Sequence, residues 1–229
     1  MSHDMANTKH HLAWAKSSDI ERNGSTMKVA IIGAGNVGKA LGTSITRAGH
    51  DVTITAKDPE HARAAAREIG ATPADSNVAA VTGADVVILA MPFAGAGEAV
   101  AAEIRDEVAG KTIVDVTNPI KPDFSGLATD SSAAELFQQR FPDAHVVKAF
   151  NTIFATNQAD PSPDVDGYVA GDDEKAKAEV ISLVDSMGFT ALDVGPLSSA
   201  RFLEGMAYLN IGLNAQNGWS WTSSWKLER

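Results

Sequence analysis

The stretch VAIIGAGNVGKAL, residues 29–41, joins a short apolar run to a glycine-rich turn and the start of a helical pattern. Its glycines Gly33, Gly35 and Gly38 have the spacing G-x-G-x-x-G. In such a turn the first glycine permits a tight bend, the second leaves room for a diphosphate, and the third lets helix and strand pack closely. The helix N-terminus then offers free amides and a partial positive charge. This stretch predicts a nucleotide diphosphate on the first βαβ unit of a Rossmann-like fold.

The rest of the chain alternates short apolar runs with longer helical patterns, which is typical of a doubly wound α/β fold with a mostly parallel sheet. We expect strands at residues 28–32, 51–55, 71–72, 85–90, 112–116, 145–150, 166–171 and 190–194. A small helical C-terminal part should follow, with a helix that begins near Ser198 and buries Phe202, Met206, Leu209 and Leu213. The predicted domains are a flexible extension at 1–26, a Rossmann-type nucleotide-binding domain at 27–195 and a helical, aromatic segment at 196–229.

Bulk composition excludes several classes of function. The chain has 229 residues and a formal net charge of −10, which argues against nucleic-acid or anionic-membrane binding. It contains no cysteine, so disulfides and thiolate chemistry are absent. No apolar run is long enough for a membrane span, and residues 1–26 lack the apolar centre of a secretory signal. We therefore expect a cytoplasmic protein.

A second phosphate-binding pattern overlaps the glycine turn. Residues 33–39 also fit G-x-x-x-x-G-K, the phosphate loop of nucleotide triphosphatases. That loop requires Ser or Thr at the next position to hold magnesium, and this chain has Ala40. We therefore favour the dinucleotide interpretation and expect Lys39 to be a solvated helix residue.

The choice between NAD and NADP depends on the residues about 20 positions beyond the first glycine, which are Thr55, Ala56 and Lys57. A carboxylate there would accept the ribose 2′-hydroxyl of NAD, whereas Lys57 attracts a 2′-phosphate and Thr55 can donate its hydroxyl. A charged hydrogen bond contributes roughly 1.5–3 kcal/mol, so we predict NADP. The alternative makes Lys57 a solvated turn residue and gives the ribose to Asp58, although Asp58 also suits a helix N-cap.

The chemistry should lie beyond the carboxyl ends of the strands. Polar or turn-forming groups follow three predicted strands at Met91-Pro92-Phe93, Asn118-Pro119 and Asn151-Thr152. They are candidates to bind the nicotinamide ribose and the ring amide. The six histidines do not recur at metal-ligand spacing, and no general-base cluster is evident. We predict no catalytic acid or base and no metal, because hydride transfer between two cofactors needs alignment rather than a proton-transfer group.

Four longer blocks carry a family resemblance: residues 27–41, HVVKAFNTI at 145–153, VAGDDEKAKAEVISLVDSMGF at 169–189 and LDVGPLSSARFLE at 192–204. From residue 27 to about residue 215 the chain resembles the F420-dependent NADP reductases and the cytosolic reductase domain of the six-transmembrane metalloreductases.

The resemblance implies a Rossmann domain that binds NADPH and a C-terminal part that helps enclose a deazaflavin or flavin. It implies that Gly33, Ala34, Gly35, Asn36 and Val37 hold the diphosphate, and that Ala56-Lys57 replaces a Ser-Arg pair at the 2′-phosphate. It also implies that residues 91–93, 118–119 and 151–152 border the nicotinamide ribose and ring. The resemblance further implies a homodimer formed through the C-terminal parts. We interpret Trp219, Trp221 and Trp225 as packing at that interface, with a wall for a flat ring as the alternative.

The sequence is compatible with three alternative functions. The first is hydride transfer between NADP(H) and coenzyme F420 or a flavin (FMN or FAD). The second is an NADP-dependent dehydrogenase or imine reductase acting on a small metabolite, a class that normally has a larger helical second domain. The third is a non-enzymatic NADP sensor, which agrees with the missing base.

Overall fold

Eight strands form one sheet in the order β3-β2-β1-β4-β5-β6-β7-β8 in the computed structural model, which describes residues 26–228. The strands are β1 (Lys28–Ile32), β2 (Asp51–Thr55), β3 (Thr72–Pro73), β4 (Val86–Leu89), β5 (Thr112–Asp115), β6 (His145–Lys148), β7 (Asp166–Gly171) and β8 (Thr190–Asp193). All neighbours pair in parallel except β6 and β7, which are antiparallel. The predicted α/β fold with a mostly parallel sheet is confirmed.

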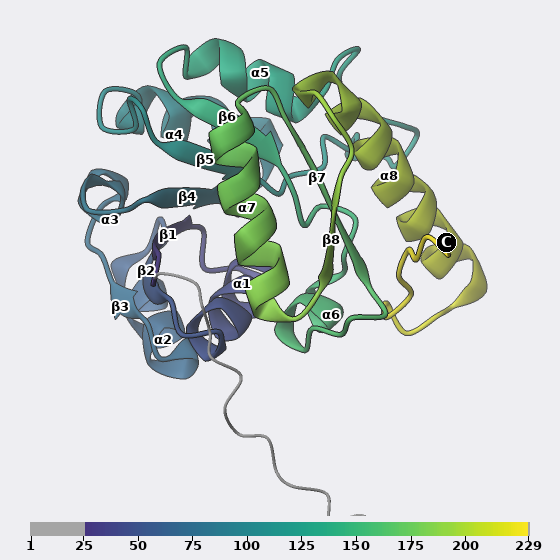
Figure 1. Ribbon diagram of the computed structural model, residues 1–229, viewed down its shortest axis with the longest axis horizontal. Helices are drawn as coiled ribbons and strands as arrows, with labels where there is room; N and C mark the ends of the chain where they lie inside the picture. Colours follow the sequence, from purple (N-terminus) through teal and green to yellow (C-terminus); the bar gives the residue numbers. More distant parts are fainter. Residues whose placement is uncertain (1–25, 229) are drawn as a thin grey trace, which may run out of the picture.

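Helices connect these strands and cover both faces of the sheet (Figure 1). They are α1 (Asn36–Arg47), α2 (Pro59–Ile69), α3 (Asn77–Thr82), α4 (Phe93–Ile104), α5 (Ala133–Arg140), α6 (Ala155–Ala159), α7 (Glu174–Met187), the 3-10 helix η1 (Leu197–Ser199) and α8 (Ala200–Asn217). Among residues 26–228, no helix combines the length and the apolar character that crossing a bilayer requires.

Alternation along the central strands explains the two-sided core. In β1, Val29 and Ile31 pack into the layer that holds α1, α2 and α7, while Ala30 and Ile32 pack into the layer that holds α3, α4 and α5. All four residues are buried. Successive side chains of a strand point to opposite faces, so a strand covered on both faces must be apolar throughout.

Local signals set the helix boundaries. Asp58 caps α2 by accepting the Glu60 amide at 2.9 Å, and the helix ends at Gly70 in the left-handed conformation. Ser132 and Glu135 form the predicted capping box at the start of α5. These boundaries agree with the sequence prediction because each depends on groups close together in the chain.

Helix α8 lies along the side of the molecule opposite α2 and β3 (Figure 1), and its orientation corrects one expectation. Phe202 and Leu209, predicted to be buried, are 67% and 53% exposed, and Met206 and Leu213 are half-buried. The helix instead buries Ala200, Leu203, Glu204, Ala207, Asn210 and Asn214. The prediction was wrong because the interior facing α8 is polar there.

Residues 219–228, called here the C-terminal strap, run back from α8 toward α6 and β7. Thr156 and Asn157 donate to the carbonyls of Trp221 and Thr222 at 2.6 and 3.0 Å. The buried Asp166 accepts from Lys226 Nζ at 3.0 Å and from the Leu227 amide at 2.6 Å. The strap is thus held by polar contacts at both ends. Apart from Thr26, the expected N-terminal extension lies outside the described residues.

Candidate nucleotide-binding site

The three glycines of the turn are required for different reasons. Gly33 has φ +114°, and a Cβ there would lie 2.3 Å from the Ala90 carbonyl oxygen. A Cβ on Gly38 would lie 1.8 Å from the Gly33 carbonyl oxygen, so helix and turn can pack this closely only because residue 38 is glycine. A Cβ on Gly35 would have no neighbour within 4 Å in the described part of the chain. The chain therefore leaves open space at Gly35, where the motif places a diphosphate.

The start of α1 completes an anion site beside that space. Gly35 is its N-cap, no side chain among residues 26–228 caps the first amides, and the first turn contains no acidic residue. The turn follows β1, whose neighbours are β2 and β4, so it lies where the strand order reverses. Ligands of open α/β sheets bind at such a switch point, beyond the carboxyl ends of the strands. Unpaired amides and the helix dipole favour a phosphate here.

A cavity of about 510 Å³ opens at the ends of β1, β2 and β4, and we call it the nucleotide cavity. Its lining includes five of the residues predicted from sequence: Gly33, Thr55, Ala56, Lys57 and Met91. Residues 75–77 and part of α4 form the opposite wall. Its volume lies within the range of about 300–1,000 Å³ found for small-molecule sites.

The charges around this cavity distinguish Lys57 from its basic neighbours. Lys57 is exposed and makes no hydrogen bond or ion pair with any residue in the range 26–228. Arg63 is engaged by Glu60 and Asp75, at 2.9 Å each, and this pairing raises the pKa of its guanidinium. Lys39 pairs with Glu68 at 3.0 Å, away from the turn. Lys57 is thus the basic side chain in this cavity that is available to a ligand.

A smaller cavity of about 170 Å³ lies on the other side of the glycine turn, and we call it the α8 cavity. Val37, Asn118, Asn151 and Thr152 line it, together with residues 207, 210 and 211 of α8. Its wall consists of amides, a hydroxyl and apolar groups, and none of the described lining residues is ionisable. The structure therefore brings three of the predicted segments to one hollow under α8.

The loop that carries Asn151 is strained and closely held. Phe150 is buried and has φ 61°, an uncommon value for a bulky residue. Gln158 Nε2 donates to the carbonyls of Phe150 and Ile153 at 3.1 and 2.9 Å. The buried oxygens Asn151 Oδ1 and Gln158 Oε1 find no hydrogen-bond donor among the described residues. Buried acceptors without donors are costly, so a ligand donor at this cavity would be stabilising.

Some predicted site residues lie outside both cavities. Ala34, Gly35, Asn36 and Gly38 form the turn and the start of α1 between them. Pro92 is the N-cap of α4, and Pro119 is buried and bonded through its carbonyl to Ala128. The Phe93 ring packs edge-on against Phe137, with centroids 5.4 Å apart, on the core side of α4. Of the segment 91–93, only Met91 lines the nucleotide cavity.

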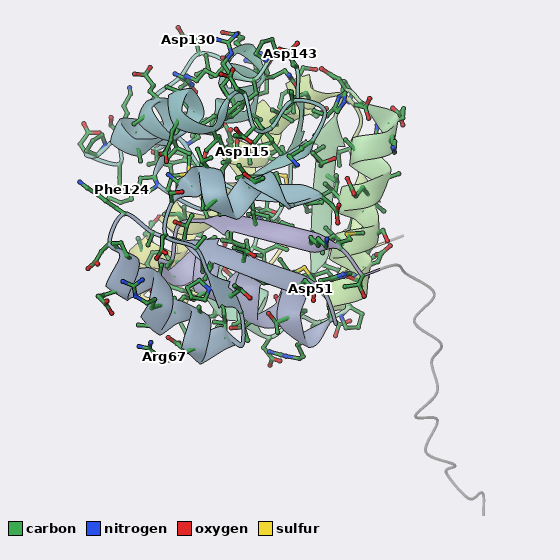
Figure 2. The ribbon with its side chains drawn as sticks, turned by 90° about the vertical axis from the view of Figure 1, so that its left-hand side faces the viewer. Asp51, Arg67, Asp115, Phe124, Asp130 and Asp143 are labelled. Carbon is green, nitrogen blue, oxygen red and sulfur yellow. The ribbon has the colours of Figure 1, made fainter. Side chains whose placement is uncertain are left out.

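Sequence reasoning missed a buried charged cluster next to the α8 cavity. Lys148 Nζ lies 2.8 Å from Asp115 Oδ2 and 2.7 Å from Glu204 Oε1, and all three side chains are fully buried. Asp115 is fully buried, whereas Asp51 and Phe124, labelled in the same view, are exposed (Figure 2). Burial raises the pKa of the Glu204 carboxyl, against the lowering effect of Lys148. The available signal was a charged residue within each apolar run, TIVDV and HVVKAF.

Comparisons with known proteins agree with this geometry. Residues 28–119 match the family described as NADP oxidoreductase, coenzyme F420-dependent. An F420-dependent NADP reductase of Methanothermobacter thermautotrophicus is 34% identical over 215 residues, which cover 83% of this chain and 90% of that protein. Rat metalloreductase STEAP3 is 34% identical over 186 residues, and the match spans 77% of this chain but only 36% of the metalloreductase.

Solved structures extend the likeness. A putative F420-dependent NADP reductase from Arthrobacter sp. FB24 superposes with a TM-score of 0.80 at 30% identity, over 89% of this chain and 100% of that one. A reductive aminase from Aspergillus terreus, with a TM-score of 0.64 at 22% identity, shares the fold. Fold, glycine turn and relatives define the class as a Rossmann-type, NADP-dependent oxidoreductase. Within that class, the chain belongs to the family of F420-dependent NADP reductases.

Proposed function

We propose that this protein transfers a hydride between NADP(H) and a deazaflavin such as coenzyme F420, or a flavin (FMN or FAD). The observation that carries the proposal is the pair of cavities on either side of the glycine turn. One has an unpaired lysine beside the end of β2, and the other has no ionisable residue in its described lining. The family membership supports the same reaction.

The first step is nucleotide binding. The open space at Gly35 and the uncapped amides of α1 suit a diphosphate. Lys57 lines the nucleotide cavity with Thr55 and Ala56, and it would contact a 2′-phosphate there. Asp58 does not compete for the ribose because its carboxylate caps α2. NADP is therefore the proposed nucleotide.

The second step is alignment of the two rings. Asn118, Asn151 and Thr152 project into the hollow that α8 covers, where the nicotinamide end of the nucleotide would lie. Met91 lines the nucleotide cavity at the end of β4. The nicotinamide supplies hydride chemistry when bound, so this chain has to orient the partners and exclude water. The non-ionisable lining suits a reaction in which no proton moves through a side chain.

The proposal is tested by stopped-flow measurement of NADPH oxidation with purified coenzyme F420, FMN or FAD as the acceptor. We expect a single-turnover signal with at least one of the three. Turnover with a ketone or imine but with none of these acceptors would contradict the proposal and favour a metabolite reductase. NADPH binding without turnover by any acceptor would favour the sensor.

A second copy of the chain is the partner we propose. Phe202 and Leu209 lie on the same face of α8 and are 67% and 53% exposed. Trp219 and Trp221 of the C-terminal strap are 48% and 43% exposed. A patch of exposed apolar side chains is typical of a protein interface, and these four belong to consecutive segments, α8 and the C-terminal strap. A two-fold contact through α8 would cover them in a homodimer.

A further inference from the structure

Lys148 lies at the centre of a buried cluster that joins three parts of the fold. Its ammonium donates to Asp115 Oδ2 at 2.8 Å, to Glu204 Oε1 at 2.7 Å and to the Thr117 carbonyl at 2.5 Å. An ammonium has three protons to donate, so its donor capacity is fully used. The acceptors come from the end of β5, from the loop that follows it and from α8.

Each of these bonds leads to the wall of the α8 cavity. Asp115 Oδ1 also accepts the Thr117 amide at 2.8 Å. The amide and the carbonyl of Thr117 are therefore both held by hydrogen bonds, immediately before Asn118. Glu204 lies one helical turn before Ala207, which lines the cavity. Lys148 itself comes two residues before Phe150, in the strained loop that carries Asn151. The cluster therefore sets the spacing between α8 and the two asparagine loops.

The geometry of the cluster is compatible with a neutral charge state. Two carboxylates and one ammonium would leave a net negative charge in a fully buried place, which is costly. The Glu204 pKa is raised by burial, and its Oε2 contacts no hydrogen-bond partner within residues 26–228. A proton on Oε2 makes the cluster neutral while Oε1 still accepts from Lys148 and from the Ala133 amide at 2.9 Å.

We propose that Lys148 is a positioning residue for hydride transfer, holding α8 and the 115–118 segment in the register that shapes the α8 cavity. Lys148 is fully buried and lines neither cavity, so it touches neither ring. The role rests on the proposed function, because it concerns how the acceptor meets the nicotinamide. Apolar side chains of similar size could fill this space without loss of stability, but they would not fix the Thr117 carbonyl.

The decisive comparison is Lys148→Met against Lys177→Met. Lys177 is the control because it too is buried and pairs with two carboxylates, Glu174 at 2.9 Å and Asp193 at 3.3 Å, yet it lines neither cavity, and its partners are exposed rather than buried. For Lys148→Met we expect the single-turnover rate to fall at least about tenfold, since a small misplacement can cost about a hundredfold. NADPH affinity, measured by calorimetry, should stay within about threefold of wild type. The control should change neither quantity.

If Lys148→Met does not fold, the single-turnover rates of Glu204→Leu and Glu204→Gln test the proposal instead. Leucine removes the acceptor that ties α8 to Lys148, whereas glutamine keeps one, so glutamine should rescue the rate that leucine loses. Equal rates in these two variants, or a folded Lys148→Met with the wild-type rate, would overturn the proposal. So would an equal loss of NADPH affinity and rate in Lys148→Met.

Hydrogen exchange separates this proposal from the proposed function. Amides of residues 115–118 should exchange at least about tenfold faster in Lys148→Met, and those in Lys177→Met should match wild type. This measurement needs no turnover. A wild-type protein that passes no hydride to any acceptor would defeat the proposed function, while unchanged exchange in Lys148→Met would defeat the positioning role.

Discussion

Asn118 and Asn151 hold two neighbouring loops together by reciprocal hydrogen bonds. Asn151 Nδ2 donates to Asn118 Oδ1 at 2.9 Å, and Asn118 Nδ2 donates to the Asn151 carbonyl at 3.0 Å. Residues 151–153 and Asn118 together line the α8 cavity. The pair therefore joins the carboxyl ends of β5 and β6 at the place where the reacting rings would meet.

Replacing one member should destabilise more than replacing both. Asn118→Leu leaves the buried Asn151 amide without its acceptor, which should lower the free energy of unfolding by about 1–3 kcal/mol. Asn118→Leu with Asn151→Leu removes both polar groups and should recover part of that loss. Urea denaturation of the wild type, both single variants and the double variant measures the coupling. Additive changes would show that the pair does not act as a unit.

Two glycines of the turn should respond oppositely to alanine. In Gly35→Ala the new Cβ meets nothing within 4 Å, so stability should change by at most about 1 kcal/mol, while NADPH affinity falls at least about tenfold. In Gly38→Ala the Cβ would lie 1.8 Å from the Gly33 carbonyl oxygen, so stability should fall by about 2 kcal/mol or more. Thermal melts and calorimetry separate the two effects. Unchanged NADPH binding by Gly35→Ala would contradict the diphosphate site.

Lys57 should decide the preference for NADP over NAD. Lys57→Glu replaces the unpaired ammonium with a carboxylate, so NADPH affinity should fall about ten- to a hundredfold while NADH affinity holds or rises. Arg63→Gln is the matched control, because Arg63 is already engaged by Glu60 and Asp75. Calorimetric titration with both nucleotides gives the ratio. A preference that survives Lys57→Glu would rule out Lys57 as the phosphate ligand.

The free energy of unfolding should fall as the pH rises, because the buried Glu204 loses a proton. Burial raises its folded pKa above the ordinary 4.5, so the proton stays on the folded protein after the unfolded chain has released it. This contribution is fully present below pH 4.5 and is lost as the pH rises through the raised folded pKa. Urea midpoints measured at increasing pH above 4.5 should decline relative to those of Glu204→Gln, a comparison in which the other titrations cancel. Parallel curves for the two proteins would refute the raised pKa.

The exposed face of α8 should hold a dimer together. Phe202→Glu adds a charge at a side chain that is 67% exposed, so the monomer should stay folded while association weakens at least about tenfold. Ala64→Glu, at an exposed position of α2 on the opposite side of the molecule, is the control. Sedimentation velocity over a range of concentrations reports the change. A monomeric wild type would contradict the proposed homodimer.

The parts of the fold and of the site that could be predicted from sequence depend on local backbone geometry. The glycine turn, the α2 cap at Asp58 and the capping box at Ser132 depend on backbone geometry within a few residues, and the structure agrees with all three. The alternation of β1 side chains between the two faces of the sheet follows from the same local geometry. The sequence also placed Thr55, Ala56 and Lys57 at the end of β2, because strand length and the spacing from the glycines fix that position.

What the sequence by itself determined is the doubly wound sheet and its glycine turn, since both arise from periodicity and backbone freedom along short stretches. Only the tertiary structure decided which face of α8 turns inward. The apolar spacing of Phe202 and Leu209 predicted their burial, but Glu204 occupies the interior instead, where Lys148 and the Ala133 amide donate to its Oε1. That choice depends on partners 56 and 71 residues away in the chain, a distance that no local pattern encodes.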